Sequence, residues 1–337
     1  MKLVLLEVSH WHFPLYIDAL LNSEAEVIAV SDRNPEVREQ YGNLFSCLSH
    51  ANWLQALDGV TPDAAVAFGR HVEMPKIGRT LIERGIPFAI EKPAGLTVDD
   101  IVDLRKRAEE ARVPVAVPLV QRIGPLQALL DRLVKEEEAV FTMTAWRFNA
   151  GPPARYPAMK CDWMLDSEMS GGGCLMNLGA HLIDLALGLM PNPPDSVFAH
   201  LDDALHGAGV EDTALVTMTA RAGGRALVET GYNFPDSAAK REYSFSLASR
   251  EHYLQTLPGG VIVHRPGGKT EMIEMNLDSD PMYGAFVSSW LSDLQTGAQT
   301  VPGLTDLEPA MRVIDAAHAA ARVGCSVAFG GGPAALL

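Results

Sequence analysis

The sequence of 337 residues contains few cysteines, and none of them forms a paired motif. The four cysteines, Cys47, Cys161, Cys174 and Cys325, are far apart in the chain, and no CxxC pair occurs. This spacing argues against a disulfide framework and favours free thiols in a reducing compartment. We therefore expect a cytoplasmic protein.

Basic residues and long apolar runs are also scarce. Lys and Arg number 27 against 42 Asp and Glu, giving a net charge of −15, and an acidic surface repels nucleic acid. The apolar runs are interrupted by polar residues, so we predict no membrane span. The stretch 1–7 is too short for a signal peptide and is expected to form a first buried strand. A hydrophobic fraction of 47% is typical of a globular chain, here long enough for two domains.

The segment after the predicted first strand lacks the glycines of a dinucleotide-binding loop. Such glycines allow backbone amides at a helix start to approach a pyrophosphate. Glu7, Ser9 and His12 stand in the three places where those glycines would lie. Two interpretations remain open: a variant loop in which Ser9, His10 or His12 contacts phosphate, with Trp11 beside them, or a closed loop that binds nothing.

What the first 120 residues do contain is an alternation of short apolar runs and helical segments. Continuous rather than alternating apolar runs suit parallel strands that are covered on both faces, and their alternation with helices predicts a doubly wound sheet. Thr97 and Asp100 have the spacing of a capping box at a helix start. The predicted strands are 3–6, 27–30, 64–68, 88–90 and 113–120, and the predicted helices are 14–21, 72–84 and 97–112.

Residues 121–337 follow a different pattern. Strand-like segments follow one another between glycine-rich turns such as Gly223-Gly224, which indicates an open, mostly antiparallel sheet with a few helices. The predicted strands are 141–148, 212–220, 226–233, 243–248, 252–257 and 261–264, and two helices near 283–294 and 307–323 close the chain. The predicted fold class is thus α/β plus α+β, with a Rossmann domain over 1–120 and a second domain over 121–337.

Asp32 lies at the end of the second predicted strand, where a carboxylate can bind a ribose 2′-hydroxyl. This position favours NAD, whereas the adjacent Arg33 leaves NADP open. His10 and His12 could chelate a metal, but a site needs a third ligand, and nothing fixes the geometry of the nearby Glu7. We predict no metal.

Lys92 follows the apolar run 86–90 and precedes Pro93, which restricts it to extended geometry. In an open α/β sheet, ligands bind at the carboxyl ends of the strands. A lysine there can polarise a substrate oxygen, and partial burial would lower its pKa. The alternative is a surface ion pair at a strand end.

Asn177, His181 and Asp184 follow the glycine run 171–173 at positions i, i+4 and i+7, on one face of a predicted helix. The glycines permit a close backbone approach. Three polar groups aligned beside an apolar stripe predict a site at the edge of a core, although a single helical histidine is often structural. Aromatic and basic groups precede this helix and suit a sugar or polyol, unless they form an ordinary sheet edge and loop: Trp146, Arg147, Arg155, Tyr156, Lys160 and Trp163.

Two motifs together carry a resemblance over most of the chain. They are Glu91-Lys92-Pro93 and the segment 171–184, GGGCLMNLGAHLID, with Arg122-Ile123-Gly124-Pro125, Trp163 and Val210-Glu211-Asp212-Thr213-Ala214 in support. The chain resembles the Gfo/Idh/MocA oxidoreductases. The resemblance implies an N-terminal Rossmann domain that binds NAD or NADP, a substrate-binding domain with an open sheet, and a homodimer or homotetramer.

The resemblance also implies roles for single residues. The motif lysine is Lys92, the motif histidine is His181, and Asn177 stands where the family often has aspartate, so that it can orient a hydroxyl but not take its proton. The strand-end motif Thr-Pro-Asn is replaced by Gly69-Arg70-His71. The predicted cofactor-binding residues are Ser9, His10, Trp11, His12, Asp32, Arg33, Phe68, Arg70, His71, Glu91 and Lys92, and the predicted substrate residues are Arg147, Tyr156, Trp163 and Asp184.

Three functions are consistent with these residues. The first is an NAD(P)-dependent oxidoreductase that acts on a carbinol or carbonyl of a sugar, polyol or related compound. The second is a glycosidase or lyase that uses NAD transiently, without net redox change. The third is a non-catalytic binding relative whose cofactor site has decayed.

Overall fold

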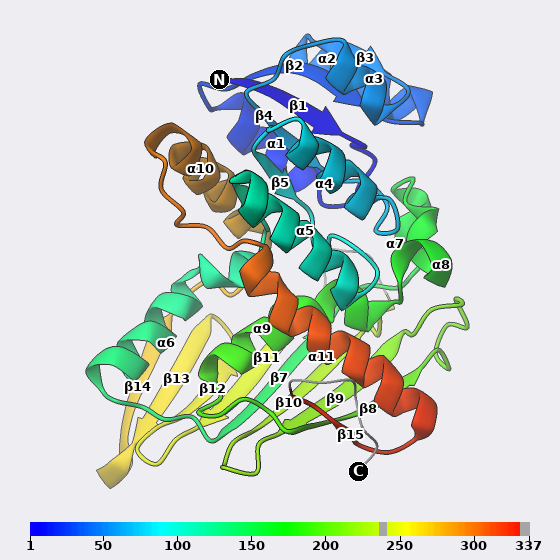
Figure 1. Ribbon diagram of the computed structural model, residues 1–337. Helices are drawn as coiled ribbons and strands as arrows, with labels where there is room; N and C mark the ends of the chain where they lie inside the picture. Colours follow the sequence, from blue (N-terminus) through cyan, green and yellow to red (C-terminus); the bar gives the residue numbers. More distant parts are fainter. Residues whose placement is uncertain (236–240, 331–337) are drawn as a thin grey trace. The chain divides into compact units, whose positions relative to one another are not determined.

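A computed structural model describes residues 1–235 and 241–330, which form two compact units (Figure 1). The first unit comprises Met1–Leu119, Tyr156–Gly171 and Asp280–Glu308, and the second comprises Val120–Arg155, Gly172–Ser279 and the chain from Pro309 onward. The predicted division into domains 1–120 and 121–337 stays a prediction. Within the first unit, Tyr156–Gly171 is attached to the loop 7–13 through Cys161 and Ser9, and Asp280–Glu308 packs on α1 (Pro14–Leu21) through its own helix.

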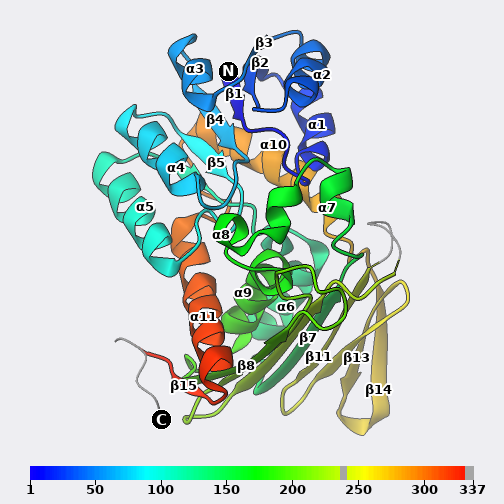
Figure 2. The same cartoon turned by 90° about the vertical axis from the view of Figure 1, so that its right-hand side faces the viewer.

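The first unit contains a six-stranded parallel sheet in the order β3-β2-β1-β4-β5-β6, which confirms the predicted Rossmann fold. The helices that connect the strands lie on both sides of this sheet (Figure 2). The strands are β1 (Lys2–Leu6), β2 (Glu26–Ser31), β3 (Leu48–His50), β4 (Ala64–Ala67), β5 (Phe88–Ile90) and β6 (Val115–Ala116). The helices are α1 (Pro14–Leu21), α2 (Pro35–Phe45), α3 (Trp53–Asp58), α4 (Met74–Glu83), α5 (Val98–Ala111), α8 (Ser167–Ser170) and α10 (Asp280–Thr296).

Local sequence signals explain most of these boundaries. The strands β4 and β5 are buried along their whole length, as the continuous apolar runs predict. The predicted capping box is present at the start of α5, where Thr97 and Asp100 satisfy each other's backbone N–H groups. The predicted strand 113–120 is wrong in length: only Val115–Ala116 pairs with β5, since Val117 instead donates its backbone N–H to the carbonyl of Pro302.

The second unit contains a nine-stranded sheet in the order β14-β13-β12-β11-β7-β10-β9-β8-β15. Every neighbouring pair is antiparallel except β7 and β10, which confirms the predicted mostly antiparallel sheet. The strands are β7 (Met143–Asn149), β8 (Ser196–Asp202), β9 (Thr213–Thr219), β10 (Arg225–Gly231), β11 (Glu242–Ala248), β12 (Tyr253–Leu257), β13 (Gly260–Arg265), β14 (Lys269–Glu274) and β15 (Val327–Ala328). The helices of this unit are α6 (Pro125–Glu136) and α9 (Ala180–Leu189), whereas α7 (Arg155–Ala158) and α11 (Leu304–Val323) each have residues in both units.

One face of this sheet packs against α9, and the alternation of burial along β7 shows which side chains point there. Thr144, Trp146 and Phe148 are buried, whereas Met143 and Arg147 are exposed on the opposite face. The stretch Ser167–Leu189, which contains α9, is long and apolar enough to cross a membrane by length and composition. However, 83% of its most apolar window is buried in the protein, which is typical of a core helix in a soluble fold.

Candidate functional site

The first loop of the first unit (residues 7–13) joins β1 to α1, where a Rossmann fold binds the phosphates of a dinucleotide. Glu7 has a φ of 58°, so it keeps the left-handed backbone that glycine normally supplies. A non-glycine residue in this conformation costs on the order of 1–3 kcal/mol. The loop has therefore kept a glycine-like turn at Glu7 while carrying a charged side chain.

Asp32 fixes this loop to the end of β2. Its side chain is fully buried, Oδ2 accepts the backbone N–H of Ser9 at 2.6 Å, and Oδ1 accepts that of Asn34 at 2.8 Å. Charged acceptors make strong hydrogen bonds with backbone amides. Asp32 thus positions the chain at the place where a ribose would be bound, and the predicted ribose contact itself stays a prediction.

His10 is buried at the centre of an aromatic cluster in the first unit. Its ring lies 5.9 Å from Trp163 and 6.3 Å from Phe68, centroid to centroid. Nδ1 accepts the backbone N–H of His12, so a neutral His10 carries its proton on Nε2. Burial lowers the pKa of His10 well below its ordinary value. Among residues 1–235 and 241–330, Nε2 has no hydrogen-bond partner, which leaves a buried N–H donor available for a ligand.

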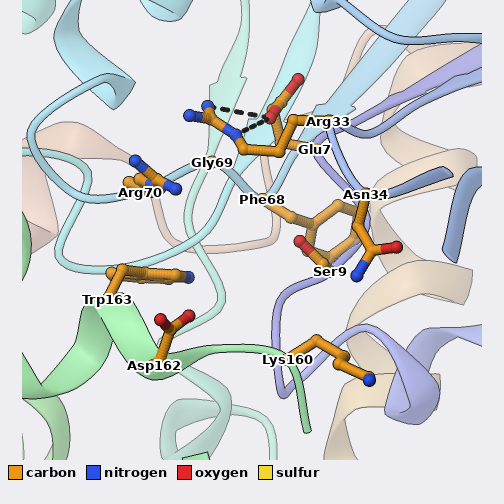
Figure 3. Close-up of a pocket in the computed structure, with 10 residues that line it drawn as sticks. All are labelled: Glu7, Ser9, Arg33, Asn34, Phe68, Gly69, Arg70, Lys160, Asp162 and Trp163. Atoms are coloured by element: carbon orange, nitrogen blue, oxygen red, sulfur yellow. Dashed lines mark hydrogen bonds and ion pairs between the residues drawn. The ribbon is translucent and has the colours of Figure 1, made fainter. Parts of the chain in front are cut away.

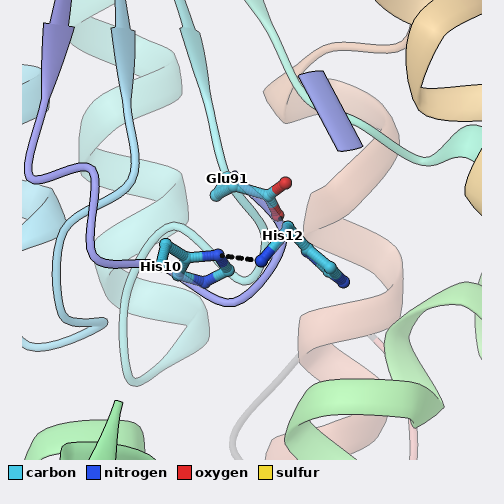
Figure 4. A group of neighbouring side chains, drawn as sticks. All are labelled: His10, His12 and Glu91. Carbon is cyan, nitrogen blue, oxygen red and sulfur yellow. Dashed lines mark hydrogen bonds and ion pairs between the residues drawn. The ribbon is translucent and has the colours of Figure 1, made fainter. Parts of the chain in front are cut away.

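His10, His12 and Glu91 lie together (Figure 4), with one potential ligand atom from each within 4.8 Å of the others. Glu91 Oε1 accepts the hydroxyl of Tyr16 at 2.6 Å, and Oε2 lies 3.1 Å from His12 Nδ1. The hydroxyl of Tyr283 also lies 3.1 Å from His12 Nε2. The third group is therefore Glu91 rather than Glu7. Because Nδ1 of His10 already accepts a hydrogen bond, Nε2 carries the proton of the neutral ring, and a metal could bind Nε2 only after that proton is lost. The three side chains therefore fit a buried hydrogen-bonded network better than a metal site.

Lys92 lies at the carboxyl end of β5 with 2% of its surface exposed. Its Nζ lies 5.6 Å from the centroid of the Trp11 ring, within range of a cation–π interaction. His71 is buried beside it and donates Nδ1–H to the carbonyl of Ser170 at 2.7 Å. Burial, with a smaller contribution from the charge of Lys92, lowers the pKa of His71 to about 4. The structure thus brings Lys92 together with two neutral histidines, His10 and His71.

A pocket of about 150 Å³ opens beside the first loop, at the carboxyl ends of β1, β2 and β4 (Figure 3). Small-molecule sites usually measure roughly 300–1,000 Å³, so the pocket suits part of a dinucleotide rather than all of it. The guanidinium of Arg70 makes no hydrogen bond or ion pair among the described residues, and this cation fits an anionic ligand. The lining residues are Glu7, Ser9, Arg33, Asn34, Phe68, Gly69, Arg70, Lys160, Asp162 and Trp163. Their hydroxyl, amide and basic groups fit a ribose phosphate.

Two residues that the sequence predicts for the substrate, Tyr156 and Trp163, lie in the first unit. Tyr156 is fully buried, and its ring meets the edge of Trp11 at 6.2 Å. Trp163 packs on His71 at 4.9 Å, centroid to centroid. The segment that carries them is anchored to the first loop, since the thiol of Cys161 donates to the carbonyl of Ser9 at 2.6 Å. Both aromatics therefore border the predicted cofactor residues.

In the second unit, Asn177, His181 and Asp184 lie on one continuous helical segment and are almost fully buried. Residues Leu175–Gly179 form a π-helical turn, a feature found often at functional sites, before α9 begins at Ala180. Asn177 Nδ2 donates to the hydroxyl of Tyr232 at 3.4 Å. The carboxylate of Asp184 forms a two-point ion pair with Arg122, which makes Asp184 an anchor between Val120–Arg122 and α9.

Arg147, the remaining residue predicted for the substrate, is not brought together with Asn177 and His181. It lies on the exposed face of β7, where its guanidinium pairs with Glu229 at 2.8 Å and with Glu242 at 3.4 Å. The helix that carries His181 packs on the other face of the sheet. The predicted role of Arg147 in substrate binding therefore gains no support from its position on the sheet.

Comparison with known proteins identifies the family of the chain. The profile of an oxidoreductase family with an NAD-binding Rossmann fold, GFO/IDH/MocA, matches residues 12–119, and the profile of the GFO/IDH/MocA C-terminal domain matches residues 139–247. The chain belongs to the GFO/IDH/MocA oxidoreductase family. A curated relative, the predicted UDP-kanosamine synthase oxidoreductase subunit of Amycolatopsis mediterranei (strain S699), is 26% identical over 189 residues. This match covers 56% of the chain and spans about half of the length of that relative, 51%.

Solved structures share the fold over nearly the whole length. GenD2 from gentamicin A biosynthesis, in complex with NAD, has a TM-score of 0.83 at 18% identity over 98% of this chain and 97% of its own. Levoglucosan dehydrogenase with NADH and levoglucosan has a TM-score of 0.82 at 15% identity over 97% and 99%. WlbA of Bordetella pertussis, with NADH and UDP-GlcNAcA, has a TM-score of 0.79 at 17% identity over 98% and 99%.

Some residues of this GFO/IDH/MocA chain acquire a role only from the structure. Glu211 accepts the backbone N–H of Leu175 at 3.1 Å and so holds the start of the segment that carries Asn177 and His181. A Cβ atom added to Gly173 would lie only 2.0 Å from the backbone carbonyl oxygen of Glu211. Glu211 and Arg122 both belong to motifs that the sequence shows. Only the fold places Glu211 beside Leu175 and Arg122 beside Asp184. No sequence pattern marked Tyr16 or Tyr283 as part of the site, because each contacts its partner, Glu91 or His12, from a distant part of the chain or another element.

Proposed function

We propose that this chain is an NAD(P)-dependent dehydrogenase or reductase acting on a CH–OH group of a sugar, polyol or nucleotide-linked sugar. The observation that carries the proposal is Lys92, a buried lysine at the carboxyl end of β5, in a family with an NAD-binding Rossmann fold. A fully buried lysine is rare unless it has a partner or a function. We also infer a cytoplasmic location from the scattered, free cysteines.

The cofactor would lie at the first loop and the pocket beside it, against Ser9, Arg70 and the unpartnered Nε2–H of His10. When bound, its nicotinamide supplies the hydride acceptor or donor. Lys92 donates a hydrogen bond to the substrate oxygen and stabilises the negative charge that develops there. His181 takes the hydroxyl proton in the oxidation direction, and Asn177 orients the hydroxyl without accepting its proton.

The substrate class is supported by the relatives. WlbA binds UDP-GlcNAcA, levoglucosan dehydrogenase binds levoglucosan, and the curated relative carries a name that refers to a UDP-sugar. Hydroxyl-rich substrates share the need for aligned polar groups, which Asn177 and His181 provide on one buried segment. A first screen therefore uses polyols, free aldoses, anhydrosugars and UDP-sugars.

The proposal predicts that Lys92→Met and His181→Asn each lower kcat at least 100-fold while the affinity for NAD(H) changes little. Removing one oxyanion donor costs about 10²–10³ in rate, and removing a general base about 10²–10⁴. The rate is followed as NADH absorbance with the best substrate from the screen, and cofactor binding by calorimetry. Lys76→Met and His200→Asn, both at exposed positions, are the matched controls. Wild-type turnover in Lys92→Met would refute the assignment.

The filled first loop is the observation that favours a second candidate, a non-catalytic relative. His10 and His12 are buried where a glycine loop would leave space for phosphates, and the adjacent pocket is small. Calorimetric titration of wild-type protein with NAD, NADH, NADP and NADPH separates the two functions. Binding at micromolar concentrations supports the oxidoreductase, whereas the absence of binding at millimolar concentrations supports the decayed site.

A further inference from the structure

The guanidinium of Arg33 forms ion pairs with two carboxylates beside the pocket. Its Nε and Nη2 donate to Glu7 Oε2 at 3.2 and 3.1 Å, and Nη2 also donates to Glu73 Oε2 at 2.6 Å. Figure 3 shows the Arg33 side chain turned toward Glu7. The Glu7 side chain is 6% exposed, so the ion pair on that side is less screened by solvent than an ordinary surface pair.

In Rossmann folds, the residues after β2 decide between NAD and NADP. A carboxylate at that position binds the ribose 2′-hydroxyl of NAD, and a nearby arginine accommodates the 2′-phosphate of NADP. This chain presents both groups, Asp32 and Arg33, in succession. We propose that Glu7 and Glu73 neutralise Arg33 and thereby make the site select NAD over NADP. The inference rests on the proposed function and names the cofactor of the same site.

Charge and conformation both support this selection. Two carboxylates, Glu7 and Glu73, already contact the guanidinium of Arg33, and a 2′-phosphate would add a further charge of about −1.5 to −2. To bind that phosphate, Arg33 would have to leave both of its partners, one of which is buried. Glu7 also adopts a left-handed backbone conformation, which glycine would adopt without strain. We infer that the ion pair of the Glu7 carboxylate with Arg33 offsets the conformational cost of this backbone.

Other basic groups nearby are placed differently. Arg38 donates to the backbone carbonyls of Asp32 and Arg33, at 3.4 and 3.3 Å. Arg70 follows β4 rather than β2, and Lys160 lies 3.8 Å from Glu36 in an exposed ion pair. Arg33 is thus the residue after β2 whose charge decides whether a 2′-phosphate is accepted.

The test is calorimetric titration of the full-length protein with NAD and NADP. Wild-type protein is expected to bind NAD at least tenfold more tightly than NADP. In Glu7→Gln/Glu73→Gln the ratio of the two dissociation constants falls at least tenfold, mainly through tighter binding of NADP. The control, Glu24→Gln/Glu39→Gln, removes the same charge from exposed positions of the first unit and leaves the ratio of the two dissociation constants within twofold.

A second variant, Arg33→Ala, keeps the inference testable if the double variant does not fold. Because the charge of Arg33 is already neutralised by the two glutamates, its removal is expected to change the ratio of the NAD and NADP dissociation constants less than threefold. A tenfold loss of NADP binding in Arg33→Ala, an unchanged ratio in the glutamate variant, or equal wild-type affinities would each overturn the selection while leaving the oxidoreductase intact. No binding of either cofactor would overturn the proposed function as well.

Discussion

At the scale of single residues, the first unit depends on histidines that fold in their neutral form. His71 donates a hydrogen bond from Nδ1–H to the carbonyl of Ser170, and burial lowers its pKa from 6.5 to about 4. Burial also lowers the pKa of His10. Because one pKa unit corresponds to 1.36 kcal/mol, the shift of His71 is worth roughly 3 kcal/mol. This part of the stability is complete above pH 6.5 and is lost as the pH falls toward 4.

The wild-type protein is therefore expected to lose stability on acidification partly through His71. The substitution His71→Asn keeps a side-chain donor for Ser170 but removes the titrating ring. Between pH 7.5 and pH 5, the free energy of unfolding of the wild-type protein should fall by about 2 kcal/mol more than that of His71→Asn. Urea unfolding at the two pH values measures this difference. An equal loss in both proteins would show that His71 does not titrate in this range.

At the scale of elements, the start of the helical segment with Asn177 and His181 is fixed by a close backbone contact. Cys174 donates its N–H to the carbonyl of Glu211 at 2.9 Å, while the side chain of Glu211 accepts the N–H of Leu175. Gly173 is required at this point because any Cβ would lie 2.0 Å from the same carbonyl oxygen. The glycine run therefore allows the backbone of the segment that precedes β9 to approach the beginning of the helix.

Gly173→Ala is expected to destabilise the protein by at least about 2 kcal/mol, because the contacting group is backbone and cannot move aside cheaply. The matched control is Gly188→Ala in α9, where an added Cβ meets nothing within 4 Å. That substitution should be neutral or stabilise by up to about 1 kcal/mol, since alanine favours helix. Thermal and urea unfolding of both variants measure the contrast. Equal stabilities would contradict the close contact.

At the scale of the whole molecule, one face of the sheet in the second unit is not covered by any helix among residues 1–235 and 241–330. The strand register aligns one row of side chains across this face: Phe198, Thr217, Leu227, Ala145, Ser246, Gln255, Ile262 and Met272. Cross-strand partners lie on the same face, so apolar and uncharged polar side chains form a continuous band. We propose that this band pairs with a second copy of the chain, as the expected homodimer or homotetramer requires.

Wild-type protein is then expected to have at least twice the chain mass in analytical ultracentrifugation. Leu227→Arg, in the middle of the band, should shift the protein toward smaller species because it buries a charge in the interface. Leu48→Arg changes an exposed leucine on β3 of the first unit and should leave the mass unchanged. A monomeric wild-type protein would contradict the predicted assembly.

Prediction from sequence succeeded where the signal is local. Continuous apolar runs gave β4 and β5, the Thr97–Asp100 spacing gave the capping box, and Gly223-Gly224 gave the turn between β9 and β10. It failed at β6, because the pairing of Val117 with Pro302 joins residues far apart in sequence. The prediction of one helical segment for Asn177 and His181 was correct in outline but did not show the π-helical turn that contains Asn177.

The sequence alone determined the two folds, the family and the identity of the candidate catalytic groups, because periodicity and motif spacing are encoded in neighbouring residues. Tertiary structure decided the partners of those groups: Arg33 with Glu7 and Glu73, Asp184 with Arg122, Glu91 with Tyr16, and Arg147 on the exposed sheet face. Such pairings depend on which charged or polar side chains share a buried space after folding. Residues far apart in the chain meet there, and no local pattern encodes the meeting.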